Sequence, residues 1–168
     1  MKDSQLFHGS FSHSRSLPAS PAAVFAAFAD TAVRRRWFQI PSEPDGAHHE
    51  LDFRVGGAEI ARGRLAGAGL PETIEYRSRF VEIVPEERII YTYELSLNGE
   101  LRSVSLVSVE LAPDAGGTRL TYTEHYVFTA FSGDGWHDRA ERERGIPLQL
   151  NGLQAVIGAG SHARGARA

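Results

Sequence analysis

The chain has 168 residues, of which 42% are hydrophobic, and its 18 basic and 21 acidic residues give a formal net charge of −3. This length favours one domain with a real core, and the charge argues against a general nucleic-acid binder. The absence of cysteine excludes disulfides, thiol nucleophiles and thiolate metal sites. No apolar run approaches the ~18 residues of a membrane span, and the first residues do not resemble a signal peptide. We therefore expect a soluble, cytoplasmic protein.

The first part of the chain predicts one strand and two short helices. Residues 7–17 have strand-like spacing diluted by serines, which is typical of an edge strand. Ser20 and Pro21 form a helix-start signal, because serine caps free amides and proline suits the first helical position. Residues 32–38 predict a second short helix after it. Both helices are too short to be stable alone, so they must pack on something larger.

The middle of the chain predicts six consecutive strands joined by short turns. Apolar and polar residues alternate along these segments. Asn98 and Gly99 form the strongest hairpin signal. Short turns between successive strands indicate an antiparallel meander rather than a parallel sheet with crossover helices. The predicted strands are residues 50–55, 60–65, 73–84, 88–97, 101–111 and 118–128.

The C-terminal part predicts one helix. Residues 133–145 are polar and bounded by glycine, which predicts a loop with about one helical turn. Pro147 can open the last helix, in which Leu150, Leu153 and Ile157 follow a period of 3.6. Gly145, Pro147 and Gly152 could also shorten or kink this helix, and the sequence leaves that open. We expect a single domain over residues 7–157 and a flexible tail over residues 158–168.

This order of elements predicts an α+β fold with a cavity. A long twisted sheet of six or seven strands must curl, and the last helix is the apolar element that remains to cover its concave face. A curved sheet wrapped around one helix need not close tightly along its whole length. We therefore expect a hydrophobic cavity between the two and look for function there.

Six short motifs resemble the START/Bet v 1-like (SRPBCC) helix-grip superfamily, in particular its bacterial branch related to the C-terminal domain of the Hsp90 ATPase activator. The resemblance spans about residues 7–157. Most of the motifs are structural, marking a helix start, a helix end, a hairpin and turns. They are residues 18–25 (PASPAAVF), 36–38 (RWF), 50–57 (ELDFRVGG), 83–89 (IVPEERI), 117–121 (GTRLT) and 122–125 (YTEH).

The resemblance implies a cavity that binds lipids, polyketides or other small apolar molecules. Some members of the superfamily are cyclases or dehydratases, and others are transport or co-chaperone proteins. Three hypotheses therefore stand: a ligand-binding protein, a cyclase- or dehydratase-type enzyme, and a partner of an Hsp90-type chaperone. The third is not favoured, because the eukaryotic activator has an additional N-terminal domain. The chain departs from the pattern of the branch at His125, where glutamine is more frequent.

The candidate ligand-binding residues lie on the predicted inward faces. Aromatic rings with a few hydroxyl groups suit a flat apolar ligand that carries some polar groups, although each ring taken singly is also ordinary core packing. The candidates are Trp37, Phe38, Phe53, Tyr76, Ser78, Phe80, Tyr91, Tyr93, Glu124, Tyr126, Phe128 and Leu153.

Glu124 is the best catalytic candidate. Alternation places it on the inward face of the last strand, between two tyrosines. Desolvation there would raise the pKa of its carboxyl group and suit it to general acid or base chemistry. The alternatives are that it orients a ligand, points to the rim, or pairs with an arginine such as Arg54 or Arg79.

Other charged and histidine residues predict no metal, cofactor or nucleic-acid site. His48 and His49 are adjacent, so in a strand they point to opposite faces and cannot easily share one metal ion. The basic run of residues 34–36 and the alternating charges of residues 141–144 are typical of solvated faces. The predicted edge strand also makes a homodimer plausible.

Overall fold

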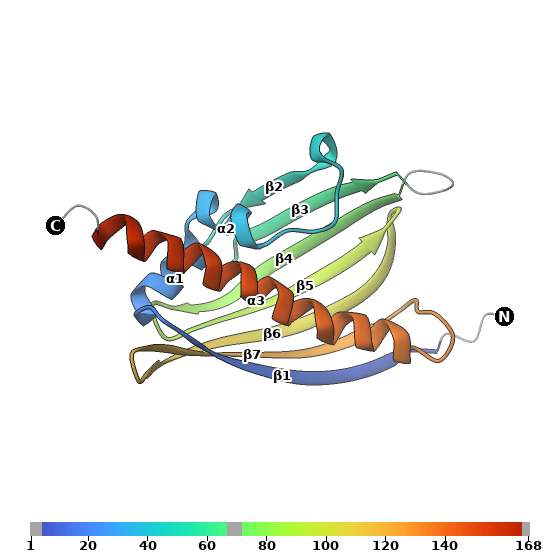
Figure 1. Ribbon diagram of the computed structural model, residues 1–168. Coiled ribbons are helices and arrows are strands. Elements are labelled where there is room, and N and C mark those ends of the chain that lie inside the picture. Colours follow the sequence, from blue (N-terminus) through green and yellow to red (C-terminus); the bar gives the residue numbers. More distant parts are fainter. Residues whose placement is uncertain (1–4, 67–71, 166–168) are drawn as a thin grey trace.

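The structure is a computed structural model that describes residues 5–66 and 72–165, with side chains described as far as residue 159. One curved antiparallel sheet of seven strands holds the molecule together, in the order β1-β7-β6-β5-β4-β3-β2 (Figure 1). The predicted α+β helix-grip fold is confirmed. The strands are β1 (Phe7–Leu17), β2 (His48–Leu51), β3 (Ala58–Leu65), β4 (Glu72–Val84), β5 (Arg88–Leu97), β6 (Glu100–Asp114) and β7 (Gly117–Phe128).

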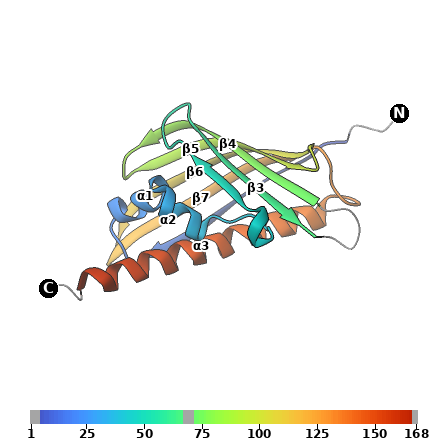
Figure 2. The same ribbon diagram turned by 90° about the horizontal axis from the view of Figure 1, so that it is seen from above.

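All helices lie on the concave side of this sheet. Helix α3 runs along that side, and α1 and α2 lie beside its C-terminal half (Figures 1 and 2). Within the described ranges, no helix is both long enough and apolar enough to cross a membrane. The helices are α1 (Pro21–Ala29), α2 (Thr31–Trp37), the short 3₁₀ helix η1 (Pro44–Gly46) and α3 (Trp136–Gly165).

The first two helices begin where the sequence predicts. The Ser20 hydroxyl accepts a hydrogen bond from the backbone N–H of Ala23 at 3.3 Å, and Pro21 is the first helical residue. Asp30 ends α1 and caps α2, since its carboxylate accepts a hydrogen bond from the N–H of Val33 at 2.9 Å. One residue thus closes one helix and starts the next.

The predicted strand over residues 50–55 is wrong in its second half. Strand β2 starts earlier, at His48, and ends at Leu51. After Leu51 the chain turns, with hydrogen bonds from Gly57 N–H to the Arg54 carbonyl and from Asp52 N–H to the Ala58 carbonyl. Gly56 has φ +81°, which glycine adopts without steric cost. The alternation of apolar and polar residues therefore continues beyond Leu51, where the strand itself ends.

The predicted loop over residues 133–145 is also wrong, because α3 begins at Trp136 and contains Pro147 in its interior. The preceding Gly133 and Gly135 have positive φ and mark the true start. Charged residues sustain the first turns, since Arg139 pairs with Glu143 one turn later at 2.7 Å.

The proline and glycines do not shorten the last helix. Gly145 and Gly152 both lie inside α3, and Gly152 packs against Trp37 of α2. The backbone is helical as far as Gly165, beyond the predicted end at residue 157. Residues 166–168 lie outside the described residues, so the flexibility of the tail stays a prediction.

An ion pair lies inside the core between α2 and the sheet. Arg34 is 4% exposed and donates two hydrogen bonds of 2.8 Å to the carboxylate of Glu59 on β3. Its guanidinium also lies 4.2 Å from the ring centroids of Trp37 and Phe38. His49 of β2 contacts the same carboxylate at 2.8 Å. The prediction of a solvated basic run is therefore wrong for Arg34, which lies on the buried side of α2.

Burial and the neighbouring charges shift the pKa of Glu59 in opposite directions. Burial raises the pKa of Glu59, but the Arg34 guanidinium and the His49 hydrogen bond outweigh it, so the pKa lies below its ordinary value. The carboxylate is therefore ionised at neutral pH and compensates the buried cation.

We predict that Glu59→Gln lowers the free energy of unfolding by about 3–5 kcal/mol, because it leaves Arg34 buried without a counter-charge. The matched control is Glu75→Gln, which breaks the solvent-accessible pair with Arg62 and should cost less than about 1 kcal/mol. Urea unfolding at neutral pH measures both. Equal costs for the two variants would contradict the assigned role of the buried pair.

The difference between the parent protein and Glu59→Gln should also depend on pH. The folded pKa of Glu59 lies below its unfolded value of about 4.3. Its ionisation therefore contributes fully to stability above that pH, and the contribution is lost as pH falls through the folded pKa. Urea unfolding at pH values from about 7 to 3 should show the two proteins converging only in the acid range.

Candidate functional site: a pocket between the sheet and helix α3

A pocket of about 790 Å³ lies between the concave face of the sheet and the N-terminal half of α3. One wall consists of residues from β4, β5, β6 and β7, and the other belongs to α3 and to the segment after α2. The lining comprises Phe38, Gln39, Ile40, Pro41, Glu72, Ile74, Tyr76, Tyr91, Tyr93, Leu95, Ser96, Leu97, Arg102, Ser103, Tyr122, Phe128, Ala130, Ser132, His137, Asp138, Glu141, Arg142, Gly145, Ile146 and Gln149.

The pocket exists because the two halves of α3 present different side chains to the sheet. In the C-terminal half, Leu150, Leu153 and Ile157 are buried in the core. In the N-terminal half, Ile146 is the one large apolar side chain among the described α3 residues that line the pocket. The other α3 lining residues are glycine or polar, and of these Arg142 packs over the rings of Tyr93 and Phe128 at 5.4 Å. The pocket therefore lies where the α3 side chains that face the sheet change from apolar to mostly polar.

The sheet wall of the pocket is aromatic. The rings of Tyr76 and Tyr93 lie on neighbouring strands with centroids 4.9 Å apart, and Phe38 packs edge-on against Tyr76 at the same distance. Burial raises the pKa of Tyr76, Tyr91 and Tyr93, so these phenols stay protonated at neutral pH. The wall therefore offers apolar faces and neutral hydroxyl groups.

The hydroxyl of Tyr76 is available to a ligand. The side chain is 5% exposed and lines the pocket. In the part of the chain that the structure describes, no hydrogen-bond partner is found for this hydroxyl, whereas the Tyr93 hydroxyl donates to Glu124. A hydroxyl that lines a pocket can pair with water or with a polar group that enters the pocket.

Glu124 on β7 is the centre of a buried polar network. Its side chain is fully buried and accepts hydrogen bonds from Tyr93 at 2.7 Å, Ser105 at 2.8 Å and Tyr122 at 2.8 Å. Arg142 of α3 completes the set with an ion pair of 3.0 Å. The carboxylate is thus paired with a cation and surrounded by donors, as a buried charge requires.

Arg142 links α3 to three strands. Besides Glu124, its guanidinium donates to Ser103 at 2.7 Å and to the Tyr93 hydroxyl. Burial alone would lower the pKa of Arg142, but the phenol and the carboxylate beside it outweigh burial and raise it. The guanidinium is therefore a permanent cation, held in place by groups of the sheet.

Glu124 pairs with an arginine, as one of the alternatives predicts, but its partner is Arg142 and not Arg54 or Arg79. Arg54 is exposed and pairs with Asp52 at 2.9 Å, and Arg79 is exposed on β4. The alternating charges of residues 141–144 instead predict that Arg142 lies on a solvated face. A signal for it exists in the sequence, because the helical stripe of Leu150, Leu153 and Ile157 extends back through Ile146 to Arg142 at the same spacing.

The structure brings together five of the predicted ligand-binding residues in the pocket lining. These are Phe38, Tyr76, Tyr91, Tyr93 and Phe128. The other seven pack behind or beside the pocket. They are Trp37, Phe53, Ser78, Phe80, Glu124, Tyr126 and Leu153.

Some of these other residues have evident packing roles. Trp37 donates its indole N–H to the Ala27 carbonyl at 2.9 Å, and Phe53 packs edge-on against Phe80. The buried hydroxyls of Ser78 and Tyr126 have no partner among the described residues. The lining residues that sequence reasoning missed come mostly from α3 and from the segment after α2, which carry no local pattern for a pocket.

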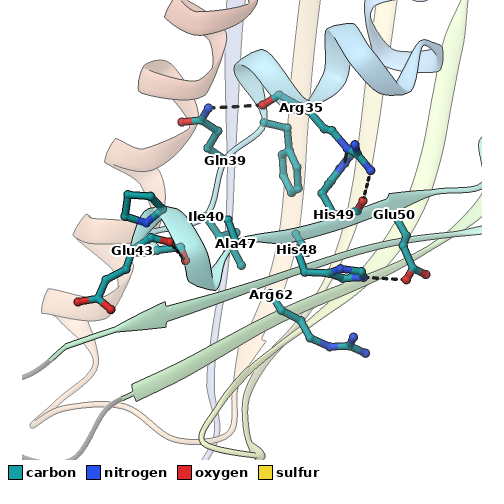
Figure 3. A pocket seen from close by; sticks show the side chains of 13 residues that line it. Arg35, Gln39, Ile40, Glu43, Ala47, His48, His49, Glu50 and Arg62 are labelled. Atoms are coloured by element: carbon teal, nitrogen blue, oxygen red, sulfur yellow. Dashed lines mark hydrogen bonds and ion pairs between the residues drawn. The ribbon is translucent and has the colours of Figure 1, made fainter.

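A second pocket of about 580 Å³ lies beside β2 and shares Phe38, Gln39 and Ile40 with the first (Figure 3). His48 contacts Glu50 at 2.7 Å on the exposed side, whereas His49 turns inward to Glu59. The two imidazoles thus point to opposite faces, as their adjacency predicts. Within residues 5–66 and 72–165, no group of three or more metal-ligating side chains is assembled.

A comparison with models of protein families identifies one family. A model of the family described as "Activator of Hsp90 ATPase homolog 1-like protein" matches residues 18–158. A comparison with curated proteins gave no match.

Solved structures share the fold. An uncharacterized protein from Rhizobium leguminosarum is 33% identical, with a TM-score of 0.78 over 92% of this chain and 97% of that one. The Mll3558 protein from Rhizobium loti is 39% identical, with a TM-score of 0.73 over 90% and 99%. DynU16, from the dynemicin biosynthetic locus, is 18% identical and shares the fold, with a TM-score of 0.62 over 90% of this chain and 48% of its own. The chain therefore belongs to the Hsp90 ATPase activator homologue 1-like family of the helix-grip superfamily.

Proposed function

We propose that the protein binds a small, mostly apolar ligand in the pocket between the sheet and α3. The observation that carries this proposal is the wall of aromatic rings that lines the pocket, in which the rings of Tyr76 and Tyr93 lie with their centroids 4.9 Å apart. The volume of about 790 Å³ lies in the range of small-molecule sites. The location of the DynU16 gene in a biosynthetic locus is consistent with a small-molecule ligand for this fold.

We predict that Leu95→Trp lowers the affinity for a neutral aromatic probe at least about tenfold, because the larger side chain fills the pocket from its β5 wall. The probe is N-phenyl-1-naphthylamine, whose fluorescence rises in apolar surroundings. The matched control is Leu106→Trp, which places the same ring at an exposed position that does not line the pocket. Native mass spectrometry of the purified protein should also reveal any co-purified ligand.

Two results would contradict this proposal. One is that the probe fails to bind the parent protein. The other is that the probe binds Leu95→Trp and Leu106→Trp with equal affinity, which would place it elsewhere on the molecule.

A cyclase- or dehydratase-type enzyme would need an acid or base that reaches the substrate. Glu124 does not line the pocket, and its carboxylate already accepts bonds from Tyr93, Ser105, Tyr122 and Arg142. We propose instead that Glu124 holds Arg142, and through it the first half of α3, against the sheet.

We predict that Glu124→Gln lowers the free energy of unfolding by about 3–5 kcal/mol, because the buried Arg142 guanidinium loses its counter-ion. The double variant Glu124→Leu/Arg142→Met should lose less than the sum of the two single changes, since it removes both charges together. Urea unfolding of the single and double variants gives this coupling. A Glu124→Gln variant with parental stability that abolished turnover of a polyketide-type substrate would support the enzyme hypothesis instead.

The remaining partner hypotheses concern the surface. Because the proposed site is a pocket, we expect no retention of the protein on Hsp90 of the source organism in a pull-down.

The strand β1 forms one edge of the sheet, and we propose pairing of two such edges as the route to a homodimer. Analytical ultracentrifugation tests that assembly without reference to the ligand.

A further inference from the structure

We propose that residues 38–40 form a partition between the two pockets, and that the side chain of Ile40 sets the length of the ligand that the first pocket accepts. This inference rests on the proposed function, because it concerns the size limit of the same ligand site. It follows from the lining that the two pockets share, from the anchoring of the partition and from the apolar surface that lies beyond it.

The two pockets meet at the partition. Phe38, Gln39 and Ile40 line both of them, the first with a volume of about 790 Å³ and the second with a volume of about 580 Å³. Figure 3 shows the second pocket, with Gln39 and Ile40 on the segment that follows α2. Because the same three residues border both spaces, the side chains of the partition separate one pocket from the other.

The backbone on both sides of the partition is anchored. At its start, Phe38 is the C-cap of α2, and its N–H donates to the Arg34 carbonyl at 2.8 Å. After its end, the Glu43 N–H donates to the Arg64 carbonyl at 2.8 Å, and the Ser42 hydroxyl accepts the Arg64 N–H at 3.1 Å. The segment is thus tied to α2 at one end and to β3 at the other, so it cannot move aside as a unit without breaking these bonds.

Gly63 of β3 lets this segment lie close to the sheet. A Cβ atom at residue 63 would collide with the carbonyl oxygen of Pro41 and would come within 3.1 Å of the Ser42 Cβ. The backbone next to the partition is therefore in direct contact with the strand. This contact leaves the side chains of the partition, rather than its backbone, as the adjustable barrier.

Among the three side chains, Ile40 is the one that can be changed without disturbing the core or the solvent side. The Phe38 ring is 7% exposed and lies 4.2 Å from the Arg34 guanidinium, so it belongs to the fixed core. Gln39 is exposed, and its amide donates to the Arg35 carbonyl at 3.4 Å. Ile40 is half-buried and packs against the core cluster. Its removal should therefore open a path between the pockets.

The space beyond Ile40 suits a neutral chain. Most charged side chains of the second pocket already have partners, as His48 does in Glu50 at 2.7 Å and Arg62 does in Glu75 at 2.6 Å. A chain without charge leaves these pairs intact and can pack against the apolar part of the lining. The apolar lining residues of the second pocket are Phe38, Ile40, Pro44, Ala47 and Ala61.

A series of neutral naphthyl alcohols tests the size limit. Each probe carries a 1-naphthyl ring and a terminal hydroxyl group, joined by an alkyl chain of increasing length. Competition against N-phenyl-1-naphthylamine gives the affinities. Each methylene that becomes buried raises the affinity by at most about fourfold. In the parent protein we expect this rise to stop at the chain length that fills the first pocket.

The variant Ile40→Ala should move this break to longer chains and raise the affinity of the longest alcohols at least about tenfold over the parent. Ile40→Val, which removes a single carbon, should give a smaller change in the same direction, and it tests the inference even if the alanine variant is unstable. The matched control is Ile74→Ala. It removes the same atoms from the β4 wall of the first pocket, which does not border the second, and should leave the break at the parental chain length.

A double variant identifies where the longer chain lies. Ala47 lines the second pocket and not the first, so Ala47→Trp places a ring in the second pocket alone. In combination with Ile40→Ala, this substitution should return the break to the parental chain length.

Several outcomes overturn the inference. A break at the same chain length in the parent protein, Ile40→Val and Ile40→Ala overturns it and leaves the proposed ligand-binding function intact. An equal shift in Ile40→Ala and Ile74→Ala also overturns it, because a larger first pocket would then be sufficient. So does a double variant that keeps the longer limit, since the chain would then lie elsewhere. Failure of all probes, N-phenyl-1-naphthylamine included, overturns the proposed function and this inference with it.

Discussion

The ion pair between the fully buried Glu124 and Arg142 determines where the last helix lies. A carboxylate without solvent is tolerated only with a cation and hydrogen-bond donors around it. The donors come from the sheet, but the cation comes from α3, which is separated from β7 by a glycine-containing loop. The pair fixes the N-terminal half of the helix with residue 142 over that carboxylate, and the lining residues follow from that position.

A second buried pair, Arg34 with Glu59, does the same for α2. The aromatic wall lies between the two pairs, and Tyr91 interacts electrostatically with Arg34 and with Glu124. Helix α3, which lines the pocket, and helix α2, which precedes the lining segment 38–41, are thus each tied to the concave face by an ion pair. Neutral phenols line the pocket on the sheet side. The ion pairs hold the helices against the sheet, and aromatic rings line the space that remains.

The sequence predicted the sheet well because alternation is a local property, and the strands from residue 73 to residue 128 were placed nearly as found. It failed at the start of α3 because charges that pair within a helix look the same as charges in a solvated loop until their partners are known. It assigned Arg34 and Arg142 to solvent for the same reason, since a lone arginine does not indicate a distant buried carboxylate. Phe38 and Tyr76 are buried and line the pocket, and their role in ligand binding stays a prediction. Their grouping around a pocket depends on the position of α3, which no local pattern supplies.

Different parts of α3 serve the core and the proposed ligand pocket. The apolar positions Leu150, Leu153 and Ile157 hold the helix in the core, so changes there affect stability. The pocket-facing positions His137, Asp138 and Glu141 have little part in that core, so changes there alter charge and shape at modest cost in stability. The wall opposite them consists of ring faces, which accept many flat molecules without geometric demand. For the proposed ligand, we therefore expect selectivity to depend mainly on the first turns of the helix and affinity mainly on the sheet.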